Sequence, residues 1–275
     1  MANQAFAFSD ARFGECQLVH DFLGASVRPR VEQALQTATS AEAVTWHGLL
    51  LRMIGWMRSL SKLNHPADFQ PVVSGSRALF EIAVDVTLLH FDATNPVAKM
   101  VAWEDSARLK SAMKSRDFFA STGKSPPAEL APRLSFISSS GARIETLRST
   151  YWPGKHGKGI HPPRWTGRDL GRDAEAATRY SPRGEFDLFY VMTYPSDCWN
   201  THGSGLAGVR FIQPDDFPAI SALAFKACVR FALFAAEIIC LHLGLWDATL
   251  AAEFKEHREH RLLTTTAILQ RHGAL

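Results

Sequence analysis

Three charged residues stand four positions apart in an otherwise apolar stretch of the sequence. Arg77, Glu81 and Asp85 occur in SGSRALFEIAVDVTLLHF, and nearly all residues between them are apolar. Residues at i, i+4 and i+8 fall on one face of a helix, and a helix that is apolar elsewhere is normally buried. Charged groups there need partners or change their protonation state. The spacing predicts a buried polar site, with Arg77 as an anion clamp and the carboxylates as acid/base groups or metal ligands.

Two uses of this polar row stay open. Glu81 and Asp85 are candidate ligands for a divalent metal ion, although the core helices lack the Glu-x-x-His pairs of the di-iron four-helix bundles. The other use is structural, as an ion-pair network that fixes helix register. Removing one partner of such a network is costly even where the network does no chemistry.

A second polar row lies in EFDLFYVMTYPSDCWNTHGSG. Asp187, Tyr190, Tyr194 and Asp197 recur at intervals of three or four residues, and His202 follows at a glycine-rich end. Tyrosine hydroxyls, a carboxylate and a histidine can form a catalytic or ligand-binding pocket. The alternative places the tyrosines at the edge of the core, with wet hydroxyls, and His202 as a cap of the helix end.

The apolar segment 219–245 contains a third polar row, made of Lys226, Arg230 and Glu237. Arg230 and Glu237 are two turns apart and could reach the other rows across a helical bundle. In the expected pocket His202 is the acid or base, and Arg77 and Arg230 stabilise an anion. Its residues are Arg77, Glu81, Asp85, Tyr194, Asp197, His202 and Arg230. The three charges also argue against a membrane span, because their insertion cost exceeds the gain from the apolar residues.

The segment 151–164, YWPGKHGKGIHPPR, is basic and aromatic and contains no acidic residue. Basic groups between aromatic rings suit phosphate contact and base stacking. The candidate substrate-binding residues are therefore Trp152, Lys155, Lys158 and Arg164. The segment lacks the spacing of a Walker loop, and a flexible surface loop is the alternative.

Helices are the elements that would position these residues, because apolar residues recur mainly at helical spacing and strict alternation is scarce. Ser40 is the predicted cap of one helix, and Asn95-Pro96 predicts the start of another. Pro195 is expected to kink or stop a helix. We expect an all-α fold, a single bundle of about eight or nine helices. It forms one domain over 1–275, in which 121–181 is a loop-rich insert with an irregular basic loop near 150–166.

Composition fits this architecture. The 275 residues are 46% hydrophobic and 21% charged, which is typical of globular rather than disordered chains. The four cysteines are far apart and form no CxxC pair, which favours a reduced, cytoplasmic protein over a disulfide frame or zinc site. The net charge of +3 permits an acidic partner without demanding one. We expect no membrane partner, and a homo-oligomer stays open.

One pattern resembles a nuclease motif. Arg58 and His65 are separated by six residues in RSLSKLNH. This Arg-x6-His spacing is similar to the motif of the HEPN-superfamily helical ribonucleases, common in bacterial toxin and defence systems. The resemblance implies that His65 works as acid or base and that Arg58 stabilises the phosphate.

The middle of the chain also resembles an uncharacterised bacterial helical family of unknown function. The likeness covers roughly 45–205. It rests on four segments: Trp56-Met-Arg58, SRALFEIAVD, Trp165–Asp169 and YVMTYPSDCWNTHGS. This resemblance implies an all-helical fold and a bacterial source, but no established activity.

Two function hypotheses follow. The first is a bacterial enzyme that acts on a phosphate-bearing substrate, RNA or a nucleotide, in stress or phage defence. The second is a non-catalytic ligand-sensing or protein-interaction module whose buried charges are structural. The sequence contains no G-x-S-x-G and no HExxH motif, so serine-nucleophile hydrolysis and zinc proteolysis have no specific support.

Overall fold

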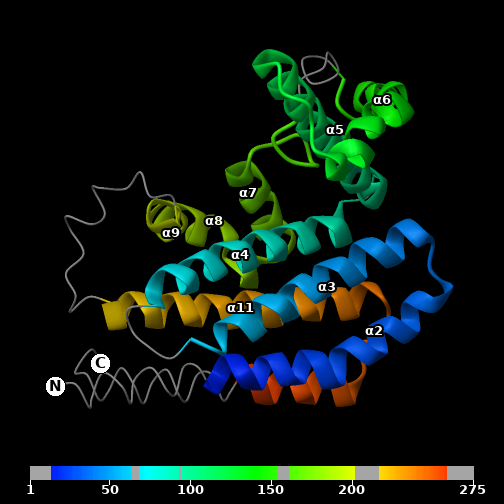
Figure 1. The fold of residues 1–275 in the computed structure, drawn as a ribbon. Coiled ribbons are helices and arrows are strands. Elements are labelled where there is room, and N and C mark those ends of the chain that lie inside the picture. The colour runs from blue at the N-terminus through cyan, green and yellow to red at the C-terminus, as the bar shows by residue number, and fades with distance from the viewer. Residues whose placement is uncertain (1–13, 64–67, 93, 154–160, 202–216, 259–275) are drawn as a thin grey trace. The chain divides into compact units, whose positions relative to one another are not determined.

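The computed structural model describes residues 14–63, 68–92, 94–153, 161–201 and 217–258, and these ranges contain helices and no strand (Figure 1). The all-α fold predicted from the sequence is confirmed. Residues 14–22 and 248–258 are helical. The other elements are η1 (Leu23–Val27), α2 (Arg28–Ala34), η2 (Leu35–Thr37), α3 (Ser40–Leu60), α4 (Phe69–Phe91), α5 (Pro96–Thr122), η4 (Ala128–Leu130), α6 (Ala131–Tyr151), α7 (Leu170–Tyr180), η6 (Pro182–Gly184), α8 (Phe186–Met192), α9 (Tyr194–Thr201) and α11 (Phe217–His242).

The chain divides into two compact units. Unit 1 consists of Met1–Phe91 and Ala174–Leu275, and unit 2 consists of Asp92–Asp173. Within unit 1, α4 packs along α11, and α3 and α9 also contact α4 (Figure 1). Within unit 2, α5 packs against α6 (Figure 1).

The segment 121–181 differs from the expected loop-rich insert, because α6 and α7 make most of it helical. Proline commonly interrupts a helix, but Pro132 stands in the first turn of α6, where its missing N–H has no helical partner to lose. The run from 138 to 141 also continues the helix. There the Ser138 hydroxyl donates to the Ser135 carbonyl at 3.0 Å, so this side chain bonds to the backbone of the preceding turn and does not interrupt the helix.

Helix α3 is capped by Thr39 and not by Ser40, the cap predicted from the sequence. Thr39 Oγ1 accepts a hydrogen bond from the Glu42 backbone N–H at 3.3 Å, and Glu42 Oε2 accepts one from the Thr39 N–H at 3.4 Å. This reciprocal pair is a capping box, which needs a glutamate or glutamine three residues after the cap. Thr39 has Glu42 at that position, whereas Ser40 has Ala43.

An aromatic cluster in unit 1 connects four helices. Phe80 of α4 lies 4.9 Å from Phe189 of α8, 5.3 Å from Phe231 of α11 and 5.5 Å from Tyr194 of α9, measured between ring centroids. Aromatic rings at such separations attract one another in addition to burying apolar surface. The cluster therefore holds the start of α9 against the middle of α4, next to the polar row of that helix.

The break between α8 and α9 comes before Pro195. Thr193 leaves the helical range with a φ of −117°, and a new helix begins at Tyr194. Pro195 thus stands in the first turn of α9, where a proline is well accommodated. Because the chain changes direction at Thr193, Tyr194 and Asp197 lie on α9 and not on a continuation of α8.

Helix α11 contains the apolar segment whose charges argued against a membrane span. Among the helices of the described ranges, none combines the length and apolarity needed to cross a membrane. Cys228 and Cys240 of α11 are buried free thiols, and Cys16 and Cys198 are free as well. The described cysteines thus form no disulfide, as their wide spacing predicted.

Candidate functional site

Two of the predicted polar rows meet in unit 1. Arg77 Nε donates to Glu81 Oε1 at 3.0 Å and to the Tyr194 hydroxyl oxygen at 3.0 Å. The Tyr194 hydroxyl in turn donates to Glu81 Oε1 at 2.7 Å. These three groups form a closed triangle between α4 and α9. Together with Asp197 and Cys198, they are called the α4–α9 cluster from here on.

Asp197 is the most deeply buried carboxyl group of this cluster, with 5% of its surface exposed. Burial raises its pKa to about 7, although the neighbouring Ser76 hydroxyl and the positive charge of Arg77 both act in the opposite direction. A carboxyl group with a pKa near neutrality is populated in both protonation states, which is what a general acid or base needs.

The other two titratable groups of α9 keep their protons. Burial and the hydrogen bond to Glu81 raise the pKa of Tyr194. Burial also raises the pKa of Cys198, against the opposing charge of Arg77. Cys198 is therefore not an activated thiolate nucleophile. Cys198 is a cluster residue that was not predicted from the sequence, although its position four residues after Tyr194 places both side chains on one face of α9.

The proposed metal ligands are on one side of α4. Glu81 already accepts two hydrogen bonds through Oε1, and Asp85 lies one turn further along and is partly exposed. In the described part of the chain, no three His, Cys, Asp or Glu side chains gather where they could hold a metal ion. Within these ranges, Glu81 and Asp85 therefore have no third candidate metal ligand beside them.

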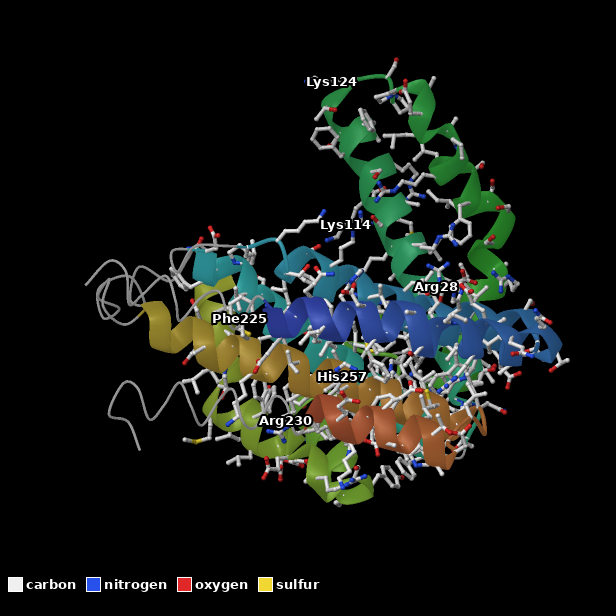
Figure 2. The ribbon with its side chains drawn as sticks, turned by 90° about the horizontal axis from the view of Figure 1, so that it is seen from below. Arg28, Lys114, Lys124, Phe225, Arg230 and His257 are labelled. Carbon is white, nitrogen blue, oxygen red and sulfur yellow. The ribbon has the colours of Figure 1, made fainter. Side chains whose placement is uncertain are left out.

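The structure does not bring Arg230 to the α4–α9 cluster. Its Nη2 donates to the Gly184 carbonyl at 2.5 Å and to Glu185 Oε2 at 2.8 Å, toward η6 and the start of α8 (Figure 2). The carbonyls at the end of η6 lack helical partners, and Arg230 supplies one. Glu237 is likewise engaged elsewhere, with its Oε2 2.5 Å from Arg258 Nη2.

In unit 2, two candidate substrate-binding residues take part in buried contacts. Arg164 Nε donates to Asp173 Oδ2 at 2.8 Å, and Arg168 Nε donates to Oδ1 of the same carboxylate at 2.7 Å. Asp173 is fully buried. The Trp152 indole N–H donates to the Trp165 carbonyl at 2.9 Å, and both tryptophans are buried. Arg164 and Trp152 thus stabilise the fold of unit 2.

Several predicted residues lie outside the described ranges: His202, Lys155, Lys158 and His65. Arg58, the other half of the nuclease-like pattern, is exposed in the last turn of α3. The roles proposed for all of them stay predictions.

No family model, no curated protein and no solved structure matches this chain. The resemblances to the HEPN ribonucleases and to a bacterial helical family therefore stay predictions too. Any functional inference has to come from the α4–α9 cluster and its surroundings.

Proposed function

We propose that this chain is an enzyme that acts on a phosphate-bearing substrate, RNA or a nucleotide, at the α4–α9 cluster. Asp197 exchanges a proton with the substrate, Arg77 binds its anionic group, and Glu81 and Tyr194 hold Arg77 in place. His202 acts as a second acid or base. In line with the sequence resemblances, we place this activity in the bacterial cytoplasm, in stress or phage defence.

The observation that carries the proposal is the burial of Asp197, which is 5% exposed, in the same cluster as Arg77. A carboxyl group near an arginine normally stays ionised, because the cation stabilises its charged form. Here burial outweighs that cation and raises the pKa to about 7. The side chains of Arg77 and Glu81 are 25% and 32% exposed, so the cluster that contains the buried Asp197 also reaches solvent.

Electrostatics at the cluster are compatible with an anionic substrate. With Asp197 protonated, the charges of Arg77 and Glu81 balance, and the cluster does not repel an anion. A planar guanidinium matches the geometry of phosphate oxygens better than an ammonium does. Ionisation of Asp197 would add a negative charge beside the substrate, so binding is expected to favour the protonated enzyme.

A second function is favoured by the closed triangle itself. Arg77, Glu81 and Tyr194 already bond to one another, as expected of a network that fixes helix packing. A non-catalytic ligand-sensing or protein-interaction module would need no more than this. The two functions differ in whether Asp197 is needed for turnover or only for stability.

The deciding experiment is an assay of the full-length protein on short RNA and on nucleotides, with and without Mg²⁺ or Mn²⁺. We expect turnover in the wild type and a loss of about 100-fold or more in kcat for Asp197→Asn, which cannot exchange the proton. Arg77→Lys keeps the charge and should mainly raise KM, because the bidentate geometry is lost.

Asp187→Asn is the matched control. Asp187 contacts Thr178 near the start of α8, with the Thr178 hydroxyl donating to its Oδ1 at 2.9 Å. The substitution makes the same chemical change in the same unit but outside the cluster. The proposal is contradicted if the wild type turns over none of these substrates, or if Asp197→Asn and Asp187→Asn have equal activity.

A further inference from the structure

Arg148 of α6 is a buried cation with an incomplete set of partners. It is 5% exposed, and its Nη1 donates to Glu145 Oε1 at 2.8 Å. Within the described ranges, its Nε and Nη2 atoms are buried and have no hydrogen-bond partner. Leaving a buried donor unpaired costs about 1–3 kcal/mol, and more when the donor is charged. A hydrogen-bond acceptor beside these two atoms would therefore stabilise the protein.

The geometry of a guanidinium group specifies what that acceptor is. Nε and Nη2 form one edge of the group, and their N–H bonds point in nearly the same direction. Two oxygens of a carboxylate or phosphate bind such an edge at once. Since Glu145 occupies Nη1, the edge that suits an oxyanion is the one that stays unpaired at Arg148.

A second group of polar side chains is built into the same unit. Ser106 Oγ of α5 lies 3.0 Å from His161 Nδ1. His161 is held in place by Trp103, whose ring centroid lies 5.4 Å away and whose indole N–H donates to the Pro162 carbonyl at 3.0 Å. These contacts fix His161 at the side of α5.

The electrostatic field at His161 is positive. Burial, together with the charges of Lys110 and Arg148, lowers its pKa to about 4. Both charged groups that act on His161 are cations, one from α5 and one from α6. Among the residues that the structure describes, the carboxylate bonded to Arg148 is that of Glu145, whose side chain is 47% exposed and thus screened by water. An anion beside Arg148 would relieve this excess of positive charge.

We propose that unit 2 contains a binding site for a phosphate group, formed by the Nε–Nη2 edge of Arg148 with Ser106, His161 and Lys110. The ligand is inorganic phosphate or the phosphate of a mononucleotide. One effect opposes binding: Arg148 is in the last turn of α6, where the helix dipole disfavours an anion by about 0.3–1 kcal/mol. The positive charge of the neighbouring Lys110 offsets it. This site is separate from the α4–α9 cluster and does not rest on the function proposed for it.

The test is calorimetric titration of the full-length protein with inorganic phosphate, at constant ionic strength set by sodium chloride. We expect saturable binding and a rise in Tm with phosphate but not with chloride. Arg148→Lys should weaken binding by about tenfold or more, because a lysine cannot offer two parallel N–H groups. Lys110→Gln, an exposed residue that the fold does not need, should weaken binding several-fold.

Arg133→Gln is the control for a generally basic surface. Arg133 is exposed and lines a hollow between α5 and α6, together with Arg108, Ser111, Pro132 and Phe136. This substitution removes one positive charge from unit 2 without touching Arg148, and should leave phosphate binding unchanged. Because Arg77 belongs to the α4–α9 cluster, phosphate binding that Arg77→Lys weakens is assigned to that cluster, whereas binding that Arg148→Lys and Lys110→Gln weaken is assigned to the site in unit 2.

Competition with AMP identifies the source of the phosphate. Tighter binding of AMP, with displacement of phosphate, indicates a mononucleotide, and failure of AMP to compete indicates the free ion. The proposal is overturned if phosphate does not bind, or if Arg133→Gln weakens binding as much as Lys110→Gln. A water molecule on the Arg148 edge, in crystals soaked with phosphate, would also overturn it. If Arg148→Lys does not fold, the comparison of Lys110→Gln with Arg133→Gln decides.

Discussion

Asp197 connects the candidate site to pH at the scale of a single residue. Its folded pKa of about 7 lies above the ordinary value of 3.8, so the folded chain keeps a proton that the unfolded chain releases between these values. The stability contributed by this group is therefore complete at low pH and is lost as the pH rises toward 7. Relative to wild type, Asp197→Asn should gain roughly 4 kcal/mol between about pH 4 and pH 7. Urea denaturation at both pH values measures this gain, and a constant difference would contradict it.

His90 and His242 give unit 1 the opposite dependence on pH. Their Nδ1 atoms are 3.3 Å apart, and burial lowers the pKa of each below the ordinary value of 6.5. As the pH falls below 6.5, the unfolded chain binds protons first, so stability is lost. We expect His90→Gln to reduce that loss. Urea denaturation at several pH values in the Asp197→Asn background measures this loss of stability without the opposite contribution of Asp197. The explanation is refuted if His90→Gln leaves the slope of stability against pH below 6.5 unchanged.

At the scale of elements, the capping box of α3 gives a direct comparison of sequence and structure. Thr39→Ala removes the hydroxyl that accepts from Glu42, and should lower the free energy of unfolding by about 1 kcal/mol. Ser40→Ala should change it little, because Ser40 is the first residue of α3 and Thr39 is the cap. Urea denaturation measures both changes. A larger loss of unfolding free energy for Ser40→Ala than for Thr39→Ala would show that Ser40 is the cap.

The sequence predicts contacts within one helix better than contacts between distant segments. The four-residue spacing of Arg77 and Glu81 predicts their pairing, and the row around Tyr194 predicts a polar face near it. Arg230 was assigned to the same pocket, but its partner is the Gly184 carbonyl, and no periodicity in α11 encodes the position of that turn. Arg148 was missed because nothing within α6 indicates the residues that come near it.

At the scale of the whole molecule, the two compact units predict that a change in one leaves the other unaffected. Gly167 of unit 2 has a φ of +80°, and a Cβ there would lie 2.9 Å from Trp152 Cδ1. Gly167→Ala should therefore destabilise unit 2 through backbone strain and this clash. It should not move the pKa of Asp197 in unit 1. A shift in the Asp197 titration in this variant would show that the units are coupled.

Helical periodicity also accounts for how much of the whole fold is predictable. It yields the all-α class and the main helices, because amphipathic spacing is a local property of the chain. The helix over 131–151 contains Pro132 and a run of serines near 138, which are residue types that commonly break helices. Pro132 is tolerated because it stands in the first turn of α6, and Ser138 is tolerated because its hydroxyl donates to the Ser135 carbonyl within the helix.

The central claim is that Asp197 is a proton-exchanging group and not a permanently ionised structural one. The most direct measurement is a pH titration of its side-chain carboxyl carbon by ¹³C NMR, assigned by comparison with Asp197→Asn. The predicted midpoint is about 7. A midpoint at or below the ordinary value of 3.8 would mean that Asp197 stays ionised at neutral pH, and would contradict its role as an acid or base.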